Sequence, residues 1–130
     1  MDVELSCLLC GSENESKDHL FFECPYSKEV WSSITTTLMF PSPPVKWTDI
    51  MAWLHSSPSG STTALALLQA WQGCISELWN ERNRRVHQGF TLPVSLLITK
   101  IISSMKNKCT AMSQIGSAHG DALLEIWSPS

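Results

Sequence analysis

Three cysteines and one histidine lie within eighteen residues near the N-terminus, in the stretch CLLCGSENESKDHLFFEC. The spacing is C-x2-C, eight further residues, then H-x4-C, and it supplies Cys7, Cys10, His19 and Cys24. Zinc takes four nitrogen or sulfur ligands in a tetrahedron, and two cysteines separated by two residues can reach one ion from a single turn. The spacing therefore predicts one zinc ion. Because protein atoms would fill all four positions, we expect that ion to be structural.

Two alternatives to zinc remain open from the residues alone. The cysteines could be small core residues beside a surface histidine, or Cys7 and Cys10 could form a redox pair. A redox pair would be expected beside a βαβ pattern, which the sequence does not show. The turn favours the metal, because Gly11 follows Cys10, where such a turn often needs a residue that tolerates positive φ. On one unbroken helix His19 and Cys24 would point about 140° apart, so the chain is expected to turn between them.

Beyond this segment, which we call the knuckle (residues 7–24), apolar residues recur at three- and four-residue spacing. That pattern predicts an all-α domain. Helices are expected from Pro25 to Leu38, from Asp49 to His55, from Ser61 to His87 and from Pro93 to a point before Gly116. Ser61 is expected to cap the long helix and Gly89 to end it. The first helix is expected to bury Val30, Trp31, Ile34 and Leu38, and the short helix has the apolar residues Ile50, Trp53 and Leu54. On the long helix one apolar stripe is expected, formed by Leu68, Trp71, Ile75, Leu78, Trp79 and Val86. The helix after Pro93 is expected to carry Leu96, Leu97, Lys100, Ile101, Met105 and Cys109.

The chain is expected to form one domain in four segments. Residues 1–40 would hold the knuckle and the first helix, 41–60 Pro- and Ser-rich loops with a short helix, 61–115 a helical hairpin, and 116–130 a tail with His119 in a loop. Cys74 and Cys109 lie on helices and are expected to be small core residues rather than ligands.

The charge is unevenly distributed. The net charge of −3 combines seven acids and two lysines in residues 1–29 with six bases and two acids in residues 77–108. A strong nucleic-acid binder usually has a basic field overall, so at most a local basic patch is expected. The candidate phosphate contacts are Arg84 and Arg85, expected to be outermost, with Lys106 and Lys108 adding to them. Such a patch would bind RNA or single-stranded DNA with a dissociation constant on the order of 10⁻⁴ to 10⁻⁶ M.

The alternative for the segment NERNRRVH is an ordinary solvated helix end. In that interpretation Glu81 pairs with Arg85 at i,i+4, and Arg82 is a partly buried structural ion pair.

The sequence also indicates a compartment. The acidic start Met1-Asp2-Val3-Glu4 is unlike a secretory signal, and the longest apolar stretch, LPVSLLITKII, is interrupted by Lys100 and too short to span a membrane. We therefore expect an intracellular protein, in the nucleus or the cytoplasm, where clustered cysteines more often hold metal than form disulfides.

Two segments carry a family resemblance. CLLCGSENESKDHLFFECPYSKEVW resembles the zinc-binding region of reverse transcriptases from plant non-LTR retrotransposons, which has a C-x2-C-G turn, an acidic linker and an H-L-F-F-x-C-P segment. WQGCISELWNERNRRVHQG is similar to the W-Q…I-W-x-E-R-N-x-R segment of the same proteins. The resemblance implies that Cys7, Cys10, His19 and Cys24 are the zinc ligands.

The chain departs from that family in two ways. The family's region usually begins with a Trp- and Lys-rich helical stretch, but Met1 lies six residues before Cys7, so the region is expected to be N-terminally truncated. No aromatic-x-Asp-Asp polymerase motif occurs, and Asp49, Asp121 and Glu125 are too scattered for a nuclease that binds Mg²⁺. We therefore expect no enzymatic activity.

Two functions remain. The first is a non-catalytic zinc-binding accessory module of retroelement reverse-transcriptase origin that binds nucleic acid weakly. The second is a zinc-stapled helical domain whose Trp-rich surfaces dock a protein partner, without nucleic-acid binding.

Overall fold

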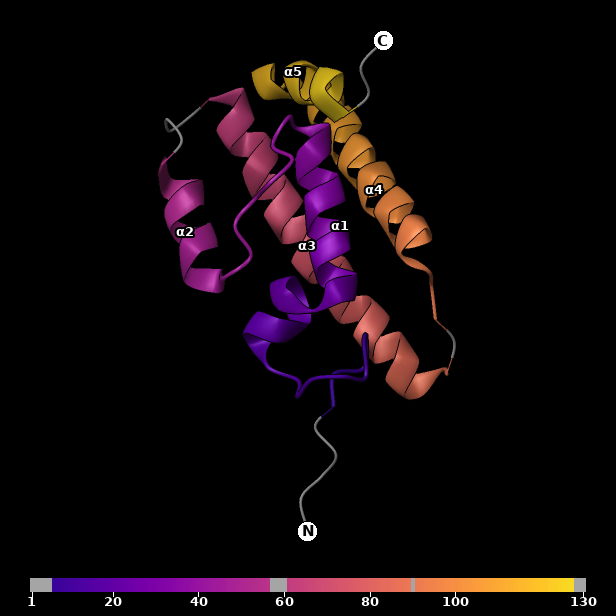
Figure 1. The fold of residues 1–130 in the computed structure, drawn as a ribbon. Coiled ribbons are helices and arrows are strands. Elements are labelled where there is room, and N and C mark those ends of the chain that lie inside the picture. Colours follow the sequence, from indigo (N-terminus) through magenta and orange to yellow (C-terminus); the bar gives the residue numbers. More distant parts are fainter. Residues whose placement is uncertain (1–5, 57–60, 90, 128–130) are drawn as a thin grey trace.

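A computed structural model describes residues 6–56, 61–89 and 91–127, and this part of the chain is helical (Figure 1). The elements in order are a π-turn (His19–Glu23), α1 (Pro25–Thr37), α2 (Trp47–Ser56), α3 (Thr62–His87), α4 (Val94–Gln114) and α5 (Ala118–Trp127). Ser6 and Asn14 form one isolated antiparallel bridge, and the described residues contain no strand. The predicted all-α fold with an N-terminal cysteine and histidine cluster is confirmed.

Helix α3 is the central element. It contacts the π-turn and each of the helices α1, α2, α4 and α5 (Figure 1). It begins as predicted, because the Ser61 hydroxyl accepts a hydrogen bond of 3.0 Å from the Ala64 N–H. It ends just before Gly89, whose φ of +74° is the left-handed conformation that stops a helix.

The buried face of α3 differs from the predicted one. Among the predicted residues Leu78 is buried, Trp71 and Ile75 are half-buried, and Leu68, Trp79 and Val86 are 42%, 46% and 48% exposed. The buried residues are instead Ala66, Leu67, Ala70, Gly73, Cys74, Leu78 and Glu81. The helix carries two apolar stripes, and the one with the smaller side chains lies inward because small residues let neighbouring helices approach closely.

The other helices largely follow the prediction. Val30, Trp31, Ile34 and Leu38 of the first helix are buried, as are Leu97, Ile101, Met105 and Cys109 of α4. Leu96 of the same helix is 53% exposed. Both Cys74 and Cys109 are fully buried, as expected for core residues.

Aromatic packing joins the knuckle to the helices. Phe22 and Trp31 are completely buried, and their rings meet edge to face with centroids 5.3 Å apart. The Trp31 indole N–H also donates a hydrogen bond of 2.8 Å to the carbonyl of Pro44. That bond ties the proline-rich loop to α1, so the loop, the first helix and the knuckle share one core.

The segment predicted to be a tail, residues 116–130, contains a further helix. Residues 118–127 form α5, which contacts α3 and α4, and His119 lies in this helix rather than in a loop. Gly116, with φ of +86°, reverses the chain after α4. The Trp127 indole then donates a hydrogen bond of 3.0 Å to Gln69 of α3. The segment was missed because a His-Gly pair in the first turn gives a weak helical signal.

Residues 57–60, expected to form a flexible join, lie outside the described residues. Within the part of the chain that the structure describes, no helix is long and apolar enough to cross a membrane.

Replacing Gly120 with alanine should separate α5 from α4. An added Cβ would lie 2.8 Å from the Ser113 Cα, and the clash is with backbone that cannot rotate away. We expect a loss of about 1–3 kcal/mol in the free energy of unfolding, measured by urea denaturation, and a red shift of tryptophan emission as Trp127 is exposed. Ala122→Ser, at an exposed position of the same helix, is the control and should leave both readouts unchanged.

Candidate metal centre

The first two candidate ligands lie on one tight turn. The Gly11 N–H donates to the carbonyl of Cys7 at 2.7 Å, and the Cys7 N–H donates to the carbonyl of Glu13 at 2.7 Å. Gly11 has a φ of +73°, as its position after Cys10 predicted. The turn therefore brings Cys7 and Cys10 to the same side of the loop.

The other two candidate ligands are brought together by the π-turn. The Cys24 N–H donates to the carbonyl of His19 at 2.7 Å, an i→i+5 bond that closes a turn wider than that of an α-helix. Cys24 then leaves the turn with an extended backbone (φ −61°, ψ 136°), and Pro25 begins α1. The predicted turn between His19 and Cys24 is confirmed.

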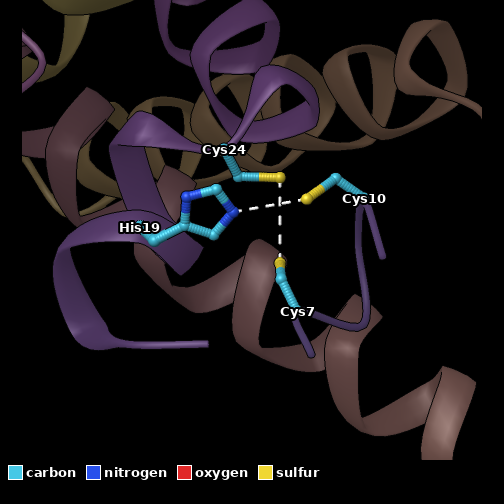
Figure 2. Close-up of side chains that lie close together, drawn as sticks. All are labelled: Cys7, Cys10, His19 and Cys24. Atoms are coloured by element: carbon cyan, nitrogen blue, oxygen red, sulfur yellow. Dashed lines mark hydrogen bonds between the residues drawn. The ribbon is translucent and has the colours of Figure 1, made fainter. Parts of the chain in front are cut away.

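The four ligand atoms converge on one point. They all lie within 4.8 Å of one another, and Figure 2 shows the side chains facing a common centre. The Cys7 and Cys24 sulfurs are 3.8 Å apart, and the Cys10 sulfur is 3.3 Å from His19 Nε2. In a zinc tetrahedron with ordinary bond lengths, two sulfurs lie about 3.8 Å apart and sulfur and nitrogen about 3.6 Å apart. The donor set and its spacing fit a tetrahedral metal ion.

Two of the thiols differ in acidity. Burial raises the pKa of Cys10, but hydrogen bonds from the Ser12 N–H, from His19 and from the Glu13 N–H outweigh it and lower that pKa to about 6. Burial raises the pKa of Cys24 to about 12, and the N–H groups of Ser27 and Tyr26 oppose it only partly. A metal ion would have to displace the proton of Cys24, whereas Cys10 is already a thiolate near neutral pH.

The arginines of α3 are not outermost, contrary to the expectation for phosphate contacts. The side chains of Arg84 and Arg85 are only 15% and 14% exposed, and both pair with Glu81, which is completely buried. The i,i+4 pair of the alternative interpretation is therefore present. Burial raises the pKa of Glu81, but hydrogen bonds from Arg85, from the Leu92 N–H and from Arg84 hold that pKa below its usual range.

Arg82 forms the structural ion pair that the alternative interpretation predicted. Its guanidinium donates to both carboxylate oxygens of Glu15, at distances from 2.9 to 3.3 Å. Glu15 lies between the two halves of the knuckle, so this pair links the knuckle to α3.

The candidate basic residues do not form one patch. Met105 packs against Gly73, and Cys109 lies beside Gln69, so Lys106 and Lys108 lie level with the first half of α3. Arg84 is eleven residues beyond Gly73, about 16 Å along the helix axis. Lys108 lines an open hollow together with Glu77 and Lys100, which themselves pair at 3.7 Å.

Sequence reasoning missed the contacts between α3 and the knuckle. Arg85 Nη1 donates to the carbonyls of Leu8 and Leu9, at 3.0 and 3.2 Å, and its guanidinium lies over the Tyr26 ring. Backbone acceptors carry no sequence signal, so these contacts could not be read from residue types. One signal for them was present in the sequence: the segment NERNRRVH has three arginines and one glutamate, so at least one arginine needs another partner.

Comparison with known proteins supports the metal assignment. Residues 1–31 match the family described as zinc-binding in reverse transcriptase. The match includes all four candidate ligands and ends within α1, before the E-R-N-x-R segment of α3. No curated protein and no solved structure matches the chain.

Metal loading should release protons at neutral pH. Cys24, with a pKa of about 12, loses its proton when its sulfur becomes a ligand, so zinc affinity should rise about tenfold per pH unit from this group alone. Cys10, with a pKa of about 6, adds a further proton only at lower pH, where the dependence steepens. Titration calorimetry in two buffers of different ionisation enthalpy counts the protons. Release of none near neutral pH would contradict the assignment of Cys24 as a ligand.

Proposed function

Starting from a zinc-binding domain of reverse-transcriptase origin at residues 1–31, we propose that the chain is a non-catalytic accessory module built around one structural zinc ion. The observation that carries this proposal is the convergence of four protein ligand atoms within 4.8 Å. Cys7, Cys10, His19 and Cys24 would hold the ion. When bound, it supplies a cross-link between the Cys7–Cys10 turn and the start of α1. With four protein ligands no coordination position is left for a catalytic water.

The knuckle is too small to fold by its own apolar burial. Its buried residues Cys7, Leu9, Leu20, Phe22 and Cys24 belong to the same core cluster as residues of α1, α3, α4 and α5. Ligands that are far apart in an unfolded chain make metal binding part of the folding free energy. The ion would therefore stabilise the attachment of the knuckle to the helices as well as the knuckle itself.

The exposed apolar residues of α3 favour an accessory function in which the domain docks onto another protein. Leu68, Trp79 and Val86 lie on one face of α3, eleven and seven residues apart, and are each more than 40% exposed. Large apolar side chains exposed along one helix face can contribute to a surface that binds another protein. This supports the zinc-stapled interaction domain over a nucleic-acid-binding one.

Nucleic-acid binding stays a prediction, and we infer that it is at the weak end of the expected range. Arg84 and Arg85 already pair with Glu81, and the chain carries a net charge of −3. Lys106 and Lys108 lie elsewhere on the molecule, so few cations could contact one strand together.

Protein purified without added metal should contain one zinc ion per chain, as counted by native mass spectrometry. Cys24→Ser should lose the ion, because it removes a thiolate ligand, and should lower the thermal stability. Cys109→Ser is the matched control: the Cys109 sulfur lies beside the Gln69 amide, which a hydroxyl can also contact, and zinc should be retained. A fully folded parent chain without zinc would overturn the proposed function.

Titration of labelled single-stranded RNA at physiological salt should give a dissociation constant of about 10⁻⁴ M or weaker. Fluorescence anisotropy at two salt concentrations measures both the affinity and its salt dependence. Affinity about a hundredfold tighter that falls steeply with salt would restore the nucleic-acid function. In that case the double substitution of Lys106 and Lys108 by glutamine, compared with the parent, would show whether α4 carries the contacts.

A further inference from the structure

Arg85 lies where α3 meets the first two candidate ligands. Leu8 and Leu9 are the two residues between Cys7 and Cys10, and Arg85 Nη1 donates to the carbonyls of both. We propose that Arg85 is a positioning residue for the metal centre: it holds the Cys7–Cys10 turn in the shape that binds the ion. This inference rests on the proposed zinc site and assigns the arginine row of α3 a role in it.

The guanidinium is itself held from two other directions. Its Nε donates to Glu81 Oε2 at 2.7 Å, and it lies over the Tyr26 ring at 4.9 Å from the ring centre. Arg85 therefore cannot follow the turn if the turn moves. The turn is instead fixed relative to α3 and to the start of α1, where Cys24 lies.

Glu81 is the rigid base of this arrangement. It is completely buried, and it accepts hydrogen bonds from Arg84, from Arg85 and from the Leu92 N–H at 2.9 Å. The Tyr26 hydroxyl donates to the carbonyl of the same Leu92 at 2.8 Å. One network thus joins the connection between α3 and α4 to α1 and, through Arg85, to the turn that carries Cys7 and Cys10.

The charges also favour a loaded site. A Zn²⁺ ion with three thiolates and a neutral imidazole carries a net charge of −1. Glu81, Arg84 and Arg85 together carry a net charge of +1, and Arg85 brings that charge to the turn with two of the thiolates. The contact therefore combines orientation of the ligands with compensation of their charge.

An arginine is required for this role. Its planar fork presents several donors at fixed angles, so one side chain can bond Glu81 and two carbonyls at once. A lysine keeps the charge and can reach one of these acceptors, but it cannot hold all three in one geometry. Arg85→Lys therefore separates positioning from charge.

The test compares zinc affinity in the full-length parent, Arg85→Lys and Ile101→Val, by competition with a chelating dye. Arg85→Lys should raise the zinc dissociation constant about tenfold or more, the effect typical of losing a residue that orients the metal ligands without itself binding the ion. It should also shift the visible absorption of the cobalt(II)-loaded protein, which reports the ligand geometry. Ile101→Val destabilises a fully buried position of α4 away from the knuckle, so it should lower the melting temperature and leave both metal readouts unchanged.

Unchanged zinc affinity and an unchanged cobalt spectrum in Arg85→Lys would overturn the inference and leave the proposed function intact. Failure of the parent to bind zinc would instead overturn the proposed function. Should Arg85→Lys not fold, Arg85→Gln provides the second variant, because a neutral amide can donate to one acceptor of Arg85 but cannot bond Glu81 and both carbonyls at once. It should weaken zinc binding in the same direction, and parental affinity in that variant would equally refute the role of Arg85.

Discussion

The buried carboxylate of Glu81 is the constraint on which the arrangement of this domain depends. A carboxylate with no exposure is strongly destabilising unless it is paired and hydrogen-bonded. Here Arg84, Arg85 and the Leu92 N–H donate hydrogen bonds to the Glu81 carboxylate. Two of these donors also contact other parts of the domain. Arg85 must reach the knuckle, and Leu92 must lie beside α1. The end of α3, the segment before α4 and the turn that carries two candidate ligands are therefore joined through one ionised group.

This coupling explains how so small a knuckle can be attached with a defined geometry. Apolar packing through Phe22 and Trp31 holds the second half of the knuckle against the helices. The first half has Cys7 and Leu9 in the core, but it is otherwise exposed or half-buried. Its position is fixed by directional contacts, namely those of Arg85 with two carbonyls and of Arg82 with Glu15. Hydrophobic burial, which is non-directional, could not fix the orientation of the two thiols in this way.

Residue types and their local spacing were enough to predict much of the fold and of the candidate site. The features that could not be predicted are those decided by packing between segments far apart in the chain. The four ligands were recognisable because metal spacing depends on residue type alone, and Ser61 and Gly89 marked the ends of α3. The buried face of α3 was not predictable from periodicity, since Trp79 and Leu78 both fit an apolar stripe and only packing against α1 and α4 selects between them. The partners of the arginines could not be inferred either, because Arg85 binds backbone carbonyls more than seventy residues away in the chain.

The two segments that carry the family resemblance are one physical unit in the folded chain. One contains the C-x2-C turn and the other contains Glu81 and Arg85, and the hydrogen bonds from Arg85 to Leu8 and Leu9 join them. Without the knuckle, Arg85 would lose two acceptors and α3 would end in a half-satisfied ionic network. Without Glu81 and Arg85, the turn would keep its own backbone hydrogen bonds and the Arg82–Glu15 pair, but it would lose its direct link to the end of α3. The hydrogen bonds of Arg85 therefore place the C-x2-C turn, and with it two of the four candidate ligands, directly against the end of α3.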